Sequence, residues 1–181
     1  QRSCRDGVAD MFFLIPVGIV IAAYLIGSIP TSYIVAKRVA GIDIRDHGSG
    51  NVGASNLTSQ VGAKWAAPVV VFDVFVKGSL SVFLVSEHVL DLGVGAQAAV
   101  AIAAIVGHNW SIFAGFSGGR GMATMLGATL AINLPLLIIY GAVPALGVLF
   151  TPWKDSAVWF LIAVLLMPVW ALLLNLPYDL F

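Results

Sequence analysis

Two glycine-rich segments contain the residue types that could bind a phosphate group. The first segment, residues 41–56, reads GIDIRDHGSGNVGASN. Its candidate catalytic residues are Arg45 and Ser49, and its candidate phosphate-binding residues are Gly48, Gly50, Asn51, Gly53 and Asn56. Glycines adopt positive φ angles easily and allow backbone amides to approach an anion closely. Hydroxyl and amide side chains add neutral donors, and arginine adds a fixed, charged fork. This combination favours a phosphate over a metal or an aromatic ligand, with a flexible loop as the alternative interpretation.

The second glycine-rich segment, residues 115–121, reads GFSGGRG and directly precedes an apolar stretch that begins at Met122. If that stretch is a helix, the free amides and the dipole at its N-terminus attract an anion. The candidate phosphate-binding residues of this region are Gly118, Gly119, Arg120, Gly121 and Thr124. A glycine-rich turn alone is weak evidence, whereas two such segments on one membrane face support each other.

Four further polar or charged side chains lie within apolar stretches. Asp73 and Lys77 are four residues apart within an apolar stretch, hence on one face of a helix. A charge in mid-membrane costs about 2.5–3.5 kcal/mol, so both should face the helix bundle. Lys77 is a candidate to hold a substrate phosphate with Asp73 orienting it, and a purely structural ion pair is the alternative. His108 is a candidate catalytic residue and Asn109 a candidate phosphate ligand, with a hydrogen-bonded core histidine as the alternative.

The composition indicates what kind of protein positions these residues. Of 181 residues 60% are hydrophobic, and only 18 are charged, nine basic and nine acidic. Residues 11–36, 92–119, 121–153 and 156–178 contain no Asp, Glu, Lys or Arg. Because about 20 apolar residues suffice for one helix to cross the bilayer, the sequence predicts an all-α, polytopic transmembrane bundle. A cytosolic globule, a disordered chain and a nucleic-acid binder are excluded.

About six apolar segments are expected. We predict helices over residues 11–36, 65–86, 94–116 and 157–176, and two short helices within 121–153 that meet near residues 133–135. Pro30 should kink the first of them. Residues 1–10 are expected to be an extension before a native start at Met11, and residues 11–181 to form a single membrane-embedded domain. The single cysteine, Cys4, and the lack of a Cys/His cluster indicate no metal or other cofactor.

The basic residues predict the orientation of the chain. The polar loop over residues 37–64 contains Lys37, Arg38, Arg45 and Lys64, whereas the turn over residues 87–93 contains no Lys or Arg. The positive-inside rule therefore places the 37–64 loop in the cytoplasm. With single crossings, the second glycine-rich segment returns to the same side. Arg2 and Arg5 argue against this orientation.

The combined motifs resemble a known family. Gly-Ser-Gly-Asn at residues 48–51, the later Gly53 and Asn56, and Gly-Gly-Arg-Gly at residues 118–121 are similar to the bacterial acyl-phosphate-dependent glycerol-3-phosphate acyltransferases. The resemblance covers residues 24–127 and implies seven membrane helices in a bacterial plasma membrane, with the last one missing here. It also implies acyl transfer from acyl phosphate to glycerol 3-phosphate, which yields lysophosphatidic acid and inorganic phosphate without a cofactor. The partners are then these two substrates and the lipid bilayer, and no oligomeric state is predicted.

The chain departs from the family pattern at four places. Ser59 stands where the family has arginine, Asp73 and Lys77 are one residue further apart, and the segment over residues 117–121 replaces Lys-Gly-Gly-Lys-Gly. The C-terminal His-x-x-Asn motif is absent, so we expect either a truncated chain or a divergent homologue. The alternatives to the enzyme are a catalytically inactive protein that binds lipid phosphate and a small-solute transporter.

Overall fold

The computed structural model describes residues 2–153 and 155–173. Within these residues the chain is helical, with no strand. Three helical stretches are long and apolar enough to cross a membrane, Leu14–Ala40, Ala63–Phe83 and Gly93–Ala114, and the shorter apolar helices are Met122–Ile132, Leu134–Phe150 and Val158–Trp170. The expectation of an all-α bundle with six apolar segments is confirmed.

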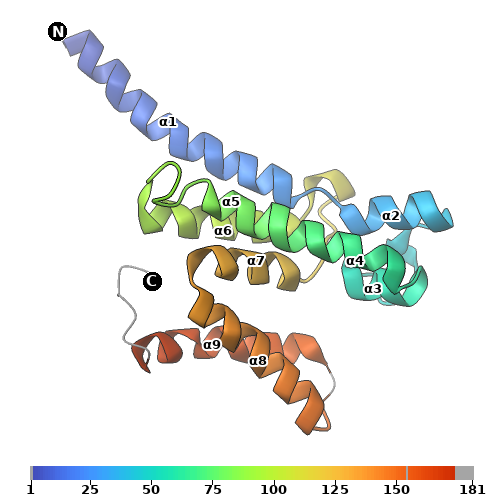
Figure 1. Cartoon of the computed structure of the whole chain (residues 1–181). Coiled ribbons are helices and arrows are strands. Elements are labelled where there is room, and N and C mark those ends of the chain that lie inside the picture. The colour runs from blue at the N-terminus through green and yellow to red at the C-terminus, as the bar shows by residue number, and fades with distance from the viewer. Residues whose placement is uncertain (1, 154, 174–181) are drawn as a thin grey trace.

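The first membrane stretch is broken where proline was expected to disturb it. Helix α1 (Arg2–Gly27) ends before a short extended link, and α2 (Thr31–Ala40) begins directly after Pro30. Helix α1 begins at Arg2, nine residues before the predicted start at Met11. Its first turns project beyond the other helices (Figure 1). Ser28 and Ser32, on either side of Pro30 at this break, are buried.

The polar loop is folded rather than open. It contains the 3-10 turn η1 (Ile44–Asp46) and helix α3 (Ala54–Gln60), neither of which the sequence pattern indicated. Buried Ile44, Val52 and Leu57 pack with Ala36 and Val69 and anchor both elements against α2 and α4. These scattered apolar residues supply the small core that a flexible linker lacks.

The second membrane stretch is one continuous rod with an unusual centre. Helix α4 (Ala63–Val71) passes into the π-helix η2 (Phe72–Leu80) and then into α5 (Ser81–Phe83). A π-helix adds one residue to a turn and commonly marks a functional site. Both Asp73 and Lys77 lie in it, and each is 1% exposed. The prediction that they face the bundle is confirmed.

Of the remaining helices, one is shorter than predicted and the pair within residues 121–153 is as expected. Helix α6 (Gly93–Asn109) ends seven residues before the expected boundary, and the 3-10 turn η3 (Ile112–Ala114) follows. The expected pair is α7 (Met122–Ile132) and α8 (Leu134–Phe150), which meet at Asn133, whose Oδ1 caps α8 by accepting from Leu136 N at 3.1 Å. Helix α9 (Ser156–Leu173) completes the fold, and its predicted continuation to residue 176 lies outside the described residues.

Small residues permit close helix crossings. Gly27 lies against the backbone of Ala104 and Gly107 against that of Tyr24, which joins α1 to α6. Gly78 and Gly127 do the same for η2 and α7, where any added Cβ would strike main-chain atoms. Large apolar side chains such as Phe75, Ile102 and Leu149 point outward instead. Small residues at helix contacts and large apolar residues on the outer surface are typical of helices that associate within a membrane, where burial of apolar side chains gives little driving force.

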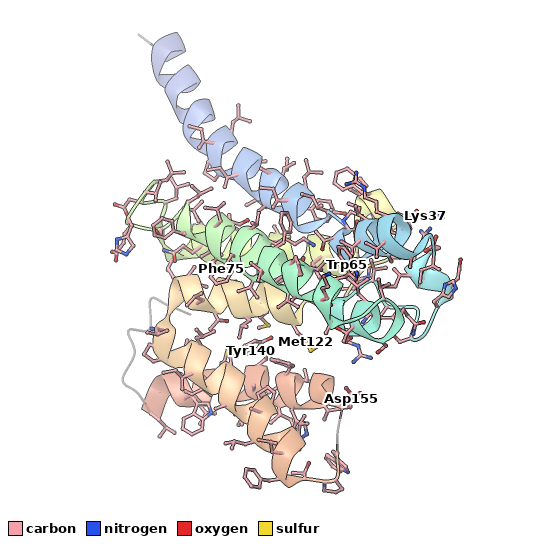
Figure 2. All side chains as sticks on the ribbon, turned by 45° about the vertical axis from the view of Figure 1, so that its right-hand side comes forward. Lys37, Trp65, Phe75, Met122, Tyr140 and Asp155 are labelled. Carbon is pink, nitrogen blue, oxygen red and sulfur yellow. The ribbon has the colours of Figure 1, made fainter. Side chains whose placement is uncertain are left out.

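Figure 1 shows how the elements are arranged. The connection between α5 and α6 lies at one end of the bundle, and α2 and α3 lie at the opposite end. Helices α8 and α9 pack on each other as a separate pair below α7. Figure 2 shows Met122 of α7 close to Tyr140 of α8, whose hydroxyl donates to the Met122 carbonyl at 3.4 Å.

Candidate active site

The two glycine-rich segments meet at one end of the bundle. The Val52 amide donates a hydrogen bond to the Gly118 carbonyl at 3.1 Å. A guanidinium nitrogen of Arg45 donates to the Ala114 carbonyl at 3.2 Å. The prediction that both segments lie on the same side of the protein is confirmed.

Asn56 organises the first segment. Its Nδ2 lies 3.0–3.2 Å from the carbonyl oxygens of Ile44, His47 and Asn51, and its Oδ1 accepts from the Ser49 amide at 3.2 Å. The side chain is 4% exposed. Its polar atoms are therefore occupied by the loop backbone, and Asn56, which was predicted to bind phosphate, instead holds the loop in shape.

Replacing Asn56 by alanine should loosen this segment. It would leave the Ser49 amide and buried carbonyls without partners, at a cost of about 1–3 kcal/mol. We expect a lower melting temperature and faster hydrogen exchange at the Ser49 amide. Thr58→Ala, at an exposed site of the same helix α3, is the matched control. Equal exchange rates in the two variants would contradict this role.

Arg45 is engaged in a local ion pair. Its Nε and Nη2 lie 2.9 and 2.6 Å from the two carboxylate oxygens of Asp43, and its guanidinium lies 5.1 Å from the Tyr33 ring centroid. Hydrogen bonding to Arg45 lowers the pKa of the Asp43 carboxyl from 3.8 to about 2. The same contact raises the pKa of the Arg45 guanidinium above its ordinary value.

The Asp43 carboxyl should consequently stay ionised in moderately acidic solution. Because its pKa is lowered on folding, its stabilising contribution is present above the ordinary value near 3.8 and is lost as the pH falls toward about 2. A carboxyl ¹³C titration of the full chain should report this low pKa. In Arg45→Met the titration should return close to the ordinary value. An unchanged titration in that variant would show that the ion pair does not form.

The second segment lies over the end of α6. The Gly119 amide donates to the His108 carbonyl at 3.0 Å. A Cβ on Gly118 would strike the carbonyls of His108 and Asn109, so only glycine fits there. Gly121 has a φ of +72° and directly precedes α7, so the first turn of that helix begins at the end of the segment.

A cavity of about 250 Å³ lies where the segments, η2 and α7 converge. Its polar lining consists of Asn51, Ser55, Asp73, His108 and Arg120. The remaining lining is apolar or glycine and includes Gly53, Gly121, Val70, Val74, Met122, Leu126 and Phe160. The lining therefore offers amide, hydroxyl and guanidinium groups together with a hydrocarbon surface.

Arg120 contributes the cation of this lining. Its Nη1 lies 3.4 Å from the carboxylate of Asp155, and its side chain is 47% exposed. The pair joins the second segment to the residues just before α9. Because an exposed ion pair contributes little to stability, the guanidinium can exchange this partner for an anion without a large cost.

A charged cluster adjoins the cavity, and two of its members, Asp73 and His108, line it. Lys77 Nζ is 2.8 Å from Asp73 Oδ1, which also accepts from the Thr31 hydroxyl at 3.1 Å. His108 Nδ1 lies 3.4 Å from the same ammonium. Lys77 was predicted to bind phosphate, but its ammonium is directed to Asp73 and His108 and does not line the cavity.

Sequence reasoning identified part of this lining. Asn51, Gly53, His108, Arg120 and Gly121 were predicted and line the cavity. The other candidates lie outside the lining: Arg45, Gly48, Ser49, Gly50, Asn56, Lys77, Asn109, Gly118, Gly119 and Thr124. Asn109 Oδ1 and Thr124 Oγ1 are buried without a hydrogen-bond partner among the described residues.

Phe160 was missed as a site residue, because it lies on α9, more than thirty residues after the last motif. Ser55, a hydrogen-bonding residue of the first segment, lines the cavity although it was not among the predicted site residues. Asp73 was singled out for its charge within an apolar run, but as a partner of Lys77 and not as a lining residue.

Comparison with known proteins gives a consistent result. A family model described as glycerol-3-phosphate acyltransferase matches residues 17–181. A glycerol-3-phosphate acyltransferase of Halalkalibacterium halodurans is 43% identical over 129 residues, which are 71% of this chain and 62% of the relative. One of Clostridioides difficile is 44% identical over 140 residues, covering 75% of this chain and 67% of the relative. The chain thus matches about three fifths to two thirds of the length of these curated relatives.

The fold is also similar to that of a solved protein. The crystal structure of PlsY, an integral membrane glycerol 3-phosphate acyltransferase in its glycerol 3-phosphate form, has a TM-score of 0.78 and 29% identity, covering 91% of this chain and 80% of that one. Its lysophosphatidic acid form gives a TM-score of 0.75. With its apolar helices and this match over most of its length, the chain is a multi-pass membrane protein that belongs to the glycerol-3-phosphate acyltransferase family.

Proposed function

We propose that this protein transfers an acyl group from acyl phosphate to the sn-1 hydroxyl of glycerol 3-phosphate, a step of phospholipid biosynthesis. The family membership supports the reaction class. The observation that carries the proposal is the cavity between the two glycine-rich segments, whose lining combines polar groups with apolar side chains. A substrate with an anionic head and an acyl chain needs both surfaces.

The reaction needs little beyond positioning. The sn-1 oxygen forms a bond to the acyl carbon, and the bond from that carbon to the phosphate oxygen breaks. Inorganic phosphate leaves and takes up the hydroxyl proton, so no covalent acyl-enzyme and no cofactor are required. Because a mixed anhydride is already activated, alignment of the reactants and hydrogen bonds to developing charge can supply most of the rate.

The lining residues can be assigned by chemistry. Arg120 and the amides at the start of α7 are suited to a phosphate, because a guanidinium and a helix N-terminus both stabilise an anion. Asn51 and Ser55 add neutral hydrogen bonds from the opposite segment. Leu126 and Phe160 continue the lining toward the apolar helices and fit an acyl chain. Arg45 and Ser49, predicted as catalytic, lie outside the lining and are not part of this proposal.

We further propose that the cavity lies on the cytoplasmic side of a bacterial plasma membrane. The four basic residues of the 37–64 loop support this orientation through the positive-inside rule. Both substrates carry a phosphate group that must reach the site from water. Both glycine-rich segments lie outside the helical stretches that are long and apolar enough to cross a membrane, which is consistent with that access.

The test is inorganic phosphate release by the purified full chain in detergent micelles. We expect release from acyl phosphate only when glycerol 3-phosphate is added, together with lysophosphatidic acid as product. Arg120→Met should raise the substrate concentration needed for half-maximal rate, and Arg38→Met, on the exposed face of α2, should not. Binding of the substrates without any product would favour the catalytically inactive homologue.

A further inference from the structure

His108 connects the charged cluster to the cavity. The ring is 7% exposed, lines the cavity and lies between the π-helix and the second segment. Its Nδ1 faces Lys77 at 3.4 Å, and the Asp73 carboxylate is 3.8 Å away from the same atom. Only the contact with Lys77 is within hydrogen-bond distance.

The contact with Lys77 determines where the imidazole proton lies. An ammonium group has three donors and no acceptor, so a nitrogen that hydrogen-bonds to it must offer a lone pair. His108 Nδ1 is therefore the acceptor, and the proton of the neutral ring resides on Nε2. A doubly protonated ring would point an N–H at an ammonium in a buried site. Asp73 holds Lys77 in this arrangement through its 2.8 Å contact.

The Nε2 edge of the ring lies against the second glycine-rich segment. Gly119 lies directly against it, and a Cβ at this position would overlap Nε2. Among the described residues no protein acceptor lies within hydrogen-bond distance of this nitrogen. The ring thus presents an unpartnered N–H donor, more than nine-tenths buried, beside Arg120 and Gly121 in the cavity lining.

We propose that His108 donates a hydrogen bond from Nε2 to a phosphoryl or carbonyl oxygen of the bound substrate. Lys77 and Asp73 act as positioning residues that select this tautomer. The inference rests on the proposed function and adds one mechanistic statement to it. With its proton on Nε2, His108 stabilises negative charge and does not remove the proton of the attacking hydroxyl.

The tautomer can be measured without any activity. Full-length protein labelled at the histidine rings with ¹³C and ¹⁵N contains three histidines, so His108→Gln identifies the signal of interest. We expect the neutral form protonated at Nε2 in the wild type and in Lys77→Arg. Lys77→Met should lose this preference. Titration with inorganic phosphate should change the chemical shift of the proton on Nε2. A ring protonated at Nδ1 would overturn the proposal. A phosphate-insensitive signal would exclude the phosphoryl oxygen as the acceptor and leave the carbonyl oxygen, which the turnover of substituted proteins tests.

A matched pair of substitutions then tests the donor in turnover. Glutamine places an amide N–H near the position of Nε2, whereas asparagine reaches only the position of Nδ1. We expect His108→Asn to lower kcat about 10²-fold, the lower end of the loss for one donor directed at developing charge. His108→Gln should stay within about tenfold of wild type by the same reasoning.

The outcomes separate the two proposals. Equal kcat values for the glutamine and asparagine variants would overturn the donor role. A wild-type chain that forms no product would instead refute the proposed function, while the ring tautomer and its response to phosphate would still decide the hydrogen-bond assignment. If the asparagine variant does not fold, the labelled wild-type protein gives the answer alone.

Discussion

Lys77→Met is expected to destabilise the helix bundle by about 3–5 kcal/mol, because it leaves the Asp73 carboxylate buried without its cation. Both side chains are 1% exposed, so water cannot replace the lost partner. The Thr31 hydroxyl remains as a single donor to the carboxylate. The free energy of unfolding in mixed micelles should show the loss, with a matching fall in melting temperature.

A double variant separates the charge from the packing. Asp73→Asn combined with Lys77→Met removes both charges. This double variant should recover most of the stability, since it buries no unpaired charge. Glu87→Gln, at the exposed turn after α5, should be neutral. If the double variant were as unstable as Lys77→Met, the cluster would matter for its shape and not for its charge. Activity is expected to stay low in the double variant, because His108 loses the donor that selects its tautomer.

The apolar runs predicted most of the helices because a membrane span has a simple requirement. Long uncharged stretches predicted two of the three described helical stretches that are long and apolar enough to cross a membrane. The third, Ala63–Phe83, was predicted from an apolar stretch that contains Asp73 and Lys77. Two local signals were also sufficient. Pro30 cannot continue a helix, and Asn133 before Leu134-Pro135 caps the next one. Both act within a few residues of themselves, so no tertiary information was needed.

Features that depend on packing were not predictable in this way. The π-helix at residues 72–80 resembles an α-helix in sequence, and it lies where Gly78 and Gly127 let η2 and α7 cross closely. The fold of the 37–64 loop depends on Asn56, which contacts carbonyl groups five to twelve residues away. Isolated apolar residues in a polar loop were the available signal, and they indicated a packed segment without giving its shape.

The candidate site was predictable as a meeting of two segments but not residue by residue. Residue type suggested Arg45 as a phosphate ligand, yet Asp43 two positions earlier already pairs with it. That pairing could have been anticipated from the Asp-x-Arg spacing. The role of His108 could not, because it depends on which ring nitrogen faces Lys77 and on the absence of a side chain at Gly119.

Gly119→Ala is expected to lower turnover about 10²-fold, since a displacement of about 1 Å in a reacting group can have that effect. The added methyl group would overlap His108 Nε2, so the ring or the second segment must move. The backbone at this position has no positive φ, which means that strain does not explain a loss. The measurement is kcat for phosphate release, together with the melting temperature.

Gly95→Ala is the control, because an added Cβ on this residue of α6 has nothing within 4 Å and should leave kcat unchanged. The coupling to His108 is tested by combining Gly119→Ala with His108→Gln. A flexible amide can give way to the methyl group, so the double variant should lose less than the product of the two single losses. Strict additivity would mean that the methyl group acts on some other contact, because residues that do not touch have independent effects. Non-additivity would place the collision at Nε2, the ring atom that lies against Gly119.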